Sequence, residues 1–138
     1  MQKSLYLLIF WRLAMNDKPK LSASHIRYLL LIKKLSEAGH GVRGIELAKE
    51  LGIKKPSAHA MLRTLTDLKL IDKKPQQAAY LTEYGIQTAE KYKRFYDAVL
   101  SVLTEYLSED EIVPEAICSM IAGMTEESLL KLTLCVCR

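Results

Sequence analysis

A chain of 138 residues has room for one domain, or for one small domain with an extension, and its 49% apolar content is enough for a packed core. The net charge of +4 is unevenly distributed: residues 1–82 carry 15 Lys and Arg against 6 Asp and Glu, whereas residues 83–138 carry 5 against 10. A basic half suits a polyanion and an acidic half is repelled by one. We therefore expect the acidic half to face away from nucleic acid and to serve self-association or sensing.

Residues 1–20 are predicted to lie outside the main domain. Their apolar run at residues 5–11 is too short to cross a bilayer, which takes about 20 residues. The polar residues 16–20 offer no small-residue cleavage site of the kind that follows a signal peptide. Residues 1–20 are therefore either an arm that packs on the body or on a partner subunit, or they include an extension, residues 1–14, upstream of a natural start at Met15.

The next stretch is predicted to be a helix. Ser22 or Ser24 can cap its start, and the segment AGHG at residues 38–41 ends it. Apolar side chains recur between these limits at the spacing of one helical face: Ile26, Leu29, Leu30, Ile32 and Leu35. We expect this broad apolar stripe to pack in the core.

Residues 42–74 carry the pattern around which the chain is organised: two short helices joined by a tight turn and followed by a basic hairpin. The first helix starts near Gly44 and ends at Gly52. Its predicted apolar face consists of Ile45, Leu47, Ala48 and Leu51. The second helix opens at residues 54–57, where Pro56 suits a first helical turn because its missing N–H is not needed there. Its predicted buried stripe consists of Ala58, Met61, Leu62, Leu65 and Leu68.

The exposed side of the second helix is short, cationic and rich in hydrogen-bonding groups near its start. It presents Lys54, Lys55, Pro56, Ser57, His59, Ala60 and Arg63. Such a set can enter a major groove, where we expect Ser57, His59 and Ala60 to meet bases and the cationic side chains to meet phosphates. The alternative from the helix pair alone is an ordinary helical hairpin with a solvated basic face, because helix pairs separated by Gly are common.

A β-hairpin is predicted directly after this second helix. Residues 70–71 and 79–81 are strand-like, and the turn-forming residues 72–77 between them include Lys73 and Lys74. A hairpin in this position is a wing, whose lysines would meet phosphates beside the groove. The hairpin favours DNA binding over a plain helical hairpin and predicts a winged helix-turn-helix domain at residues 21–83.

The acidic half begins with a long predicted helix, which Thr82 caps and which runs to about Leu107. A small winged helix cannot cover such a length, so the distal half of this helix must bury its apolar stripe elsewhere. Shorter helices are predicted from about Pro114 and from Thr125. We expect residues 84–138 to form this linking helix and a helical region that dimerises through Phe95, Val99, Leu100, Leu103 and Leu107.

The cysteines are odd in number and late in the chain, at Cys118, Cys135 and Cys137. This arrangement argues against a disulfide framework and for a reducing compartment, so we expect a cytoplasmic protein. Cys135 and Cys137 could bind a metal or become oxidised, but they lack a second pair of ligands. Their alternative role is that of two small apolar residues at a C-terminal end.

Several of these segments together resemble the diphtheria toxin repressor and manganese transport regulator family, the iron-dependent repressors. The segments are SHIRYL at residues 24–29, IELAKELGI at 45–53, Pro56 with Ser57, Met61 with Leu62 and Leu65, and LTEYG at 81–85. The likeness covers about residues 22–130. It implies a mainly α fold in which an N-terminal winged helix binds operator DNA as a dimer, and a long linking helix leads to a small helical dimerisation domain.

The same resemblance implies a switch by Mn²⁺ or Fe²⁺ bound between the two domains, but the residues at the ligand positions differ. The first ligand position falls on Arg27, a permanent cation, and the pair on the linking helix falls on Phe95 and Val99. The last pair falls on residues 121–122, which leaves Cys118 as a weak candidate. One thiol beside an arginine and apolar groups cannot hold a hard divalent ion. We therefore expect no cofactor, and Mn²⁺ or Fe²⁺ is implied by the resemblance alone.

These patterns predict a homodimeric, sequence-specific transcriptional regulator, more narrowly a repressor, that binds double-stranded DNA and no membrane. The alternatives are a Mn- or Fe-responsive repressor that uses a different site, a regulator that senses a small organic ligand, and a winged-helix module for protein interaction. An enzyme is not expected, because no Ser-His-acid, Cys-His or paired-carboxylate arrangement has a spacing that would place it in a cleft.

Overall fold

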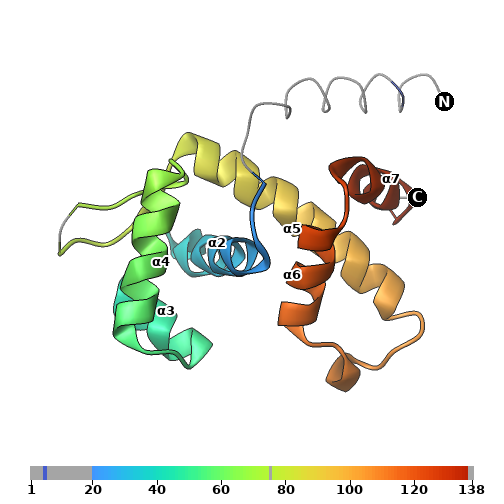
Figure 1. Ribbon diagram of the computed structural model, residues 1–138, viewed down its shortest axis with the longest axis horizontal. Helices are drawn as coiled ribbons and strands as arrows, with labels where there is room; N and C mark the ends of the chain where they lie inside the picture. Colours follow the sequence, from blue (N-terminus) through green and yellow to red (C-terminus); the bar gives the residue numbers. More distant parts are fainter. Residues whose placement is uncertain (1–4, 6–19, 75, 137–138) are drawn as a thin grey trace. The chain divides into compact units, whose positions relative to one another are not determined.

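The computed structural model describes residues 5, 20–74 and 76–136, and the chain is mainly helical (Figure 1). Its elements are α2 (Ala23–Leu35), η1 (Ser36–Ala38), α3 (Gly44–Leu51), α4 (Lys55–Asp67), β1 (Ile71–Asp72), β2 (Tyr80–Leu81), α5 (Glu83–Leu103), η2 (Glu109–Glu111), α6 (Pro114–Gly123) and α7 (Glu126–Val136). Contacts divide the chain into a winged-helix unit, His25–Lys93, and a C-terminal unit, whose described residues are 94–136 with 5 and 20–24. Except at positions 5 and 20, the predicted N-terminal arm lies outside the described residues, and so does Cys137.

Helix α2 buries the stripe that the sequence predicts. Ile26, Leu29 and Ile32 are fully covered, while Leu30 and Leu35 are half-buried. Later elements of the winged-helix unit add further fully buried side chains: Val42, Leu47, Ala58, Leu62, Leu65, Leu70 and Ile71. Helices of 8 and 13 residues are marginal alone in water, so burial of these apolar side chains is the main term that holds them in place.

Helices α3 and α4 pack against each other as the predicted helix-turn-helix (Figure 1). Gly52 ends α3 with a φ of +64°, a conformation that favours glycine. Leu47 and Ala48 are buried and Leu51 is half-buried, but Ile45 is 51% exposed. The prediction that Ile45 joins the buried face is therefore wrong. Ile45 precedes Leu47 by two residues and so projects from α3 about 200° away from it.

Helix α4 has a narrower buried face than the sequence predicts. The fully buried members are Ala58, Leu62 and Leu65, and the half-buried members are Met61 and Leu68. The chain leaves α4 through Lys69, whose φ of +64° matches that of Gly52. The Lys69 N–H donates to the Thr66 carbonyl and the Leu70 N–H to the Leu65 carbonyl, both at 3.0 Å. These bonds satisfy carbonyls that the end of α4 leaves open.

The wing is a short antiparallel hairpin of β1 and β2. Its register pairs Ile71 with Leu81 and Asp72 with Tyr80. Both strands begin one residue later than the strand patterns predict. A connection that the sequence did not indicate ties the wing to the segment before α3. Val42 and Ala79 exchange two backbone hydrogen bonds of 2.8 Å. Beside them, Gly41 has no room for a side chain, because a Cβ there would lie 2.6 Å from the Cβ of Ala78.

The LTEYG segment fixes the return of the wing into α5. The Thr82 hydroxyl donates to the Lys69 carbonyl at 2.6 Å and accepts the Gly85 N–H at 2.9 Å. The Thr82 N–H donates to the Leu70 carbonyl at 3.1 Å. Gly85 approaches this carbonyl so closely that a Cβ would overlap its oxygen. Glycine is therefore required at position 85 for a close backbone approach.

Helix α5 is the predicted long helix, but it ends at Leu103 and not near Leu107. The next residues leave the helix in turns, in which the N–H groups of Tyr106 and Leu107 both donate to the Leu103 carbonyl. The division between the two units falls inside α5, between Lys93 and Arg94. The sequence predicts a domain boundary at 83/84, where this helix begins, and that boundary stays a prediction.

The C-terminal unit contains the end of α5 together with α6 and α7. Its buried apolar residues are Leu21, Phe95, Ala98, Val99, Ile117, Cys118, Ile121 and Leu129. The helices α6 and α7 have 10 and 11 residues, at nearly the predicted positions. Across the part of the chain that the structure describes, none of the helices combines the length and the apolarity needed to cross a membrane.

Candidate nucleic-acid interface

Helix α4 leaves one face open to solvent, and this face carries the side chains that the sequence singled out. The exposed residues are Lys54, Lys55, Pro56, Ser57, His59, Ala60, Arg63 and Asp67. Ala58, Leu62 and Leu65 on the opposite side are fully buried and fix the rotation of the helix. The open face is therefore set by the packing of α4 and does not depend on the exposed residues themselves.

The N-terminal end of α4 is positively charged. Lys54 occupies the N-cap position in an extended conformation, and Pro56 follows within the first turn. The N–H groups of Ser57 and Ala58 turn back to the Lys54 carbonyl, at 3.1 and 3.2 Å. The positive end of the helix dipole thus coincides with the ammonium groups of Lys54 and Lys55.

The middle of α4 offers few polar groups for outward contacts. The hydroxyl of Thr64 donates to the Ala60 carbonyl at 3.1 Å, and that of Thr66 donates to the Leu62 carbonyl at 2.7 Å. These hydroxyl hydrogens are used within the helix. His59 and Arg63 are consequently the long polar side chains that the exposed middle of α4 presents.

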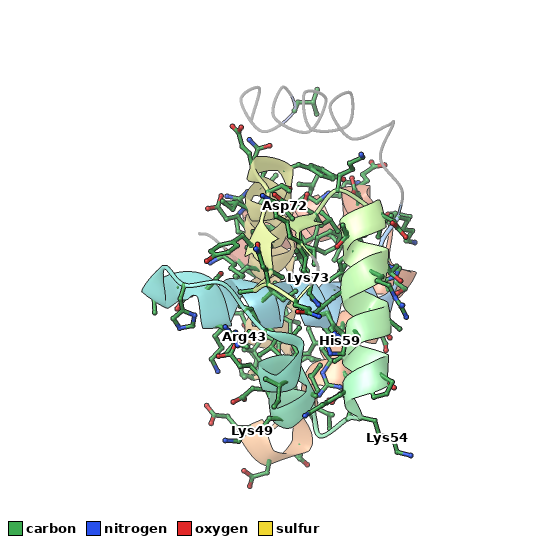
Figure 2. All side chains as sticks on the ribbon, turned by 90° about the vertical axis from the view of Figure 1, so that its left-hand side faces the viewer. Arg43, Lys49, Lys54, His59, Asp72 and Lys73 are labelled. Atoms are coloured by element: carbon green, nitrogen blue, oxygen red, sulfur yellow. The ribbon has the colours of Figure 1, made fainter. Side chains whose placement is uncertain are left out.

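The structure brings together one residue of α4 and one of the wing. Nζ of Lys73 lies 3.3 Å from Nδ1 of His59, and Figure 2 shows both side chains on the face that also carries Arg43. The His59 ring lies over the start of α3, where a Cβ on Gly44 would be 2.9 Å from Cε1 of the ring. Helix α4, the wing and the start of α3 therefore meet at His59.

Sequence patterns missed two cations on this face. Arg43 is exposed at the N-cap position of α3, where its backbone N–H donates to Oε2 of Glu46 at 2.8 Å, and Lys49 is exposed on α3 itself (Figure 2). The charge of Arg43 beside a helix start was the available signal. The contribution of α3 to this face depends on how the helices pack, so the pattern of the second helix alone does not indicate it.

The residues predicted for dimerisation differ in exposure. Phe95 and Val99 are only 1% and 2% exposed within a single chain, Leu100 and Leu103 are half-buried, and Leu107 is 40% exposed. The chain's own side chains thus cover Phe95 and Val99, and of the five, Leu107 is the residue most open to a partner. The part that these residues play in self-association stays a prediction.

The described residues do not fit the divalent metal that the family resemblance implies. Among residues 20–74 and 76–136, no three His, Cys, Asp or Glu side chains come together in a way that could hold a metal ion. The thiol of Cys118 is buried, and Cys135 is exposed. Arg27 has interactions of its own and supplies no lone pair.

Comparison with known proteins supports the architecture described above. Residues 26–75 match the family described as the IclR helix-turn-helix domain. No curated protein sequence matches the chain. The matched family is not the diphtheria toxin repressor family, so the resemblance to that family stays a prediction.

Solved structures with the same fold have low sequence identity. The hypothetical protein SSo2273 from Sulfolobus solfataricus is 23% identical, with a TM-score of 0.59 over 81% of this chain and 86% of that one. The manganese regulator SloR is 19% identical, with a TM-score of 0.65 over 79% of this chain, which spans about half (51%) of SloR. Lactococcus lactis ZitR in complex with DNA is 20% identical, with a TM-score of 0.51 over 92% and 95% of the two chains. The chain is thus a mainly helical protein with a winged helix-turn-helix fold.

Proposed function

We propose that this chain is a transcriptional regulator that binds double-stranded DNA through α4 and the wing. The observation that carries the proposal is the exposed face on which the start of α4 and the wing both present lysines, with His59 in contact with Lys73. A helix of this width fits the major groove, and a wing beside it reaches the phosphate backbone. The match of residues 26–75 to a helix-turn-helix domain and the likeness to ZitR, solved in complex with DNA, support the same reading.

The residues of this face divide into two roles. Ser57 and Ala60 are short and can approach base edges, where the serine hydroxyl can exchange hydrogen bonds and the alanine methyl can contact thymine. His59 is the third residue that the sequence predicts at base edges. The phosphate contacts fall to Lys54, Lys55, Arg63, Lys73 and Lys74, which set affinity and register.

The C-terminal unit is proposed to pair two copies of the chain. Tyr106, Leu107, Val113 and Met120 are all at least 40% exposed, so the unit has apolar side chains available for contact with a second copy. A symmetric dimer would present two α4 helices to two half-sites about 34 Å apart, one turn of the DNA helix. The operator would then be a near-palindrome, and the regulator would act as a repressor if the operator overlaps a promoter.

Regulation by Mn²⁺ or Fe²⁺ at the usual family site is not part of this proposal. SloR is described as a manganese regulator, but the described residues of this chain form no metal-binding group. The alternatives for a signal are a small organic ligand and a metal bound at a different site.

The test is selection of bound sites from a random duplex pool, with and without added Mn²⁺. The proposal predicts recovery of one near-palindromic sequence in both arms, and preference for it over a scrambled duplex in a filter-binding assay. Recovery of random sequences with equal affinity would contradict sequence-specific regulation. Absence of binding to any duplex at low salt would instead favour the winged-helix module for protein interaction.

A further inference from the structure

The contact between His59 and Lys73 joins the two elements that the proposed function assigns to DNA, and its meaning rests on that function. The two residues are 14 positions apart, one on α4 and one directly after β1. The distance of 3.3 Å from Nζ to Nδ1 is that of a long hydrogen bond. We propose that His59 is a positioning residue, which holds Lys73 of the wing where it meets a phosphate, and that it does not itself read a base.

The chemistry of the contact fixes the direction of the hydrogen bond. An ammonium group only donates, so Nδ1 of His59 accepts, and the neutral ring carries its hydrogen on Nε2. Lys73 uses one of its three N–H groups in this bond. The other two remain for phosphate oxygens, so Lys73 can hold His59 and a phosphate at the same time.

The wing needs such a support because its own ladder is short. β1 and β2 pair over two residues each, and the N–H of Gln77 closes a turn to the Lys74 carbonyl at 3.1 Å. A free lysine side chain loses rotamer entropy when a phosphate immobilises it. A lysine that His59 already orients loses less, which favours binding through preorganisation.

Glycine at position 44 makes room for the histidine ring. A Cβ there would lie 2.9 Å from Cε1 and 3.1 Å from Nδ1 of His59, which is closer than side chains pack. The nitrogen-bearing edge of the ring is therefore turned toward the start of α3. A ring in this position can support Lys73, whose Nζ lies 3.3 Å from its Nδ1.

The first experiment measures how the duplex affinity of the full chain depends on salt. Each lost phosphate contact makes the negative slope of log K against log salt less steep, reducing its magnitude by about 0.9. The loss of affinity between about 50 and about 200 mM salt is then roughly 3.5-fold smaller. We expect His59→Ala and Lys73→Ala to lower the slope equally, and the double variant to equal either single one. Preference for the selected site over a scrambled duplex should stay unchanged in all three.

Lys74→Ala is the matched control, because Lys74 is the neighbouring exposed lysine. Combined with His59→Ala, it should lower the slope by about 1.8, the sum of two separate contacts. A loss of base preference in His59→Ala with an unchanged slope would overturn the proposal. Additive losses in the His59 and Lys73 double variant would overturn it too.

Two conservative changes test the geometry of the acceptor. The side-chain oxygen of asparagine can occupy the place of Nδ1, whereas that of glutamine reaches the place of Nε2. His59→Asn should therefore restore the slope and His59→Gln should not. Gly44→Ala should act like His59→Ala on the slope, because its methyl displaces the ring, while alanine keeps α3 helical.

The second experiment needs no DNA and separates this inference from the proposed function. The tautomer of His59 is read from nitrogen chemical shifts in the free protein. The proposal predicts the Nε2–H form in the unmodified chain and a mixture in Lys73→Ala. A ring that carries its hydrogen on Nδ1 would overturn the contact, even if DNA binding is confirmed. Failure of the unmodified chain to bind any duplex would overturn the proposed function, and with it the role of the contact at a phosphate.

Discussion

The winged-helix unit and the stretch that follows it, residues 94–138, differ in charge and in what their geometry demands of the sequence. Residues 25–93 carry 13 Lys and Arg against 7 Asp and Glu, and residues 94–138 carry 3 against 8. In the winged-helix unit, Gly41, Gly44 and Gly85 each lie where a Cβ would collide with a neighbour. In the C-terminal unit, a Cβ on Gly123 would meet nothing. The winged-helix unit thus has three positions where only glycine fits, whereas Gly123 of the C-terminal unit has room for a side chain.

The difference between the two units matches two proposed functions, DNA binding and self-association. A DNA-binding face must present several side chains in a fixed arrangement, and close approaches such as the one at Gly85 limit how the wing and α4 can shift. A helical unit that associates with a copy of itself needs mainly exposed apolar area, and its negative charge keeps it away from phosphates. The following predictions test this division, from the largest effect to the smallest.

The largest effect is expected from a methyl group at Gly85. Gly85→Ala would push the added Cβ into the Leu70 carbonyl oxygen, which also accepts the Thr82 N–H, so the backbone must move. We expect a loss of about 3 kcal/mol or more in the free energy of unfolding of the winged-helix unit. Gly123→Ala in the C-terminal unit is the control and should be neutral or slightly stabilising. Urea unfolding followed by circular dichroism measures both changes. If Gly85→Ala and Gly123→Ala lower the free energy of unfolding equally, the difference between the two units is contradicted.

The next effect concerns charge on the two units. Changing both Lys73 and Lys74 to Ala should weaken binding to all duplexes alike and lower the salt slope by about 1.8. Lys131→Ala removes one charge from α7, where Lys131 pairs with Glu127 at 3.5 Å, and should leave duplex affinity unchanged. Filter binding at several salt concentrations measures both. A similar loss from Lys131→Ala would show that net charge, and not the wing, drives binding.

Self-association should depend on the C-terminal unit. Leu107→Asp places a charge on a side chain that is 40% exposed, so it should lower dimer affinity while leaving the helix content unchanged. Sedimentation at micromolar concentration measures the dimer, and circular dichroism measures the helices. Ile45→Asp, an equally drastic change on the exposed side of α3, is the control and should leave the dimer intact. If the dimer dissociates with Ile45→Asp and not with Leu107→Asp, the interface lies on the winged-helix unit, and the prediction is wrong.

A smaller effect is expected where α3 and α4 end. Gly52 and Lys69 share a φ of +64°, which costs a side chain about 1 kcal/mol. Lys69→Gly should therefore raise the free energy of unfolding by about 0.5 to 1 kcal/mol, and Gly52→Ala should lower it by about 1 kcal/mol. Urea denaturation resolves both changes. A stabilising Gly52→Ala would contradict the left-handed conformation of that residue.

The smallest effect is a pH dependence in the C-terminal unit. The backbone N–H and then the hydroxyl of Ser108 hydrogen-bond the Glu111 carboxylate, at 2.8 and 3.0 Å, and hold its pKa below the usual value. A lowered pKa means that the charged form is favoured by folding, so this contribution is present above the ordinary pKa of about 4.5 and is lost as pH falls through the lowered one. Carboxyl chemical shifts should show the lowered pKa, and Ser108→Ala should reverse part of it. An unchanged pKa in Ser108→Ala would assign the shift to the backbone alone.

Much of the fold follows from the sequence because its signals are local. Periodic apolar residues, the glycine at position 52 and the proline at position 56 place α3 and α4 to within a residue. The error at Ile45 arose because a short helix with apolar residues two apart offers two faces, and only packing selects one. The pairing of Val42 with Ala79 could not be predicted, since it joins segments far apart in sequence with no side-chain pattern.

The candidate site was predictable in its membership but not in its internal contacts. Exposure of Lys54, Ser57 and Arg63 follows from the helical period of α4. The contact of His59 with Lys73 depends on how the wing folds back, and the space over Gly44 depends on how α3 packs. Neither leaves a periodic trace in the sequence, so tertiary geometry alone reveals them.

The salt dependence of duplex binding by the unmodified chain tests the central claim most directly. A site selected from a random pool is titrated in a filter-binding assay from about 50 to about 200 mM salt. If α4 and the wing place their cations on phosphates, log K falls linearly with log salt, with a slope of about −0.9 for each phosphate neutralised. A dimer that uses several contacts per copy therefore loses affinity steeply over this range. An affinity that stays flat between these concentrations would contradict the proposal that this face binds DNA.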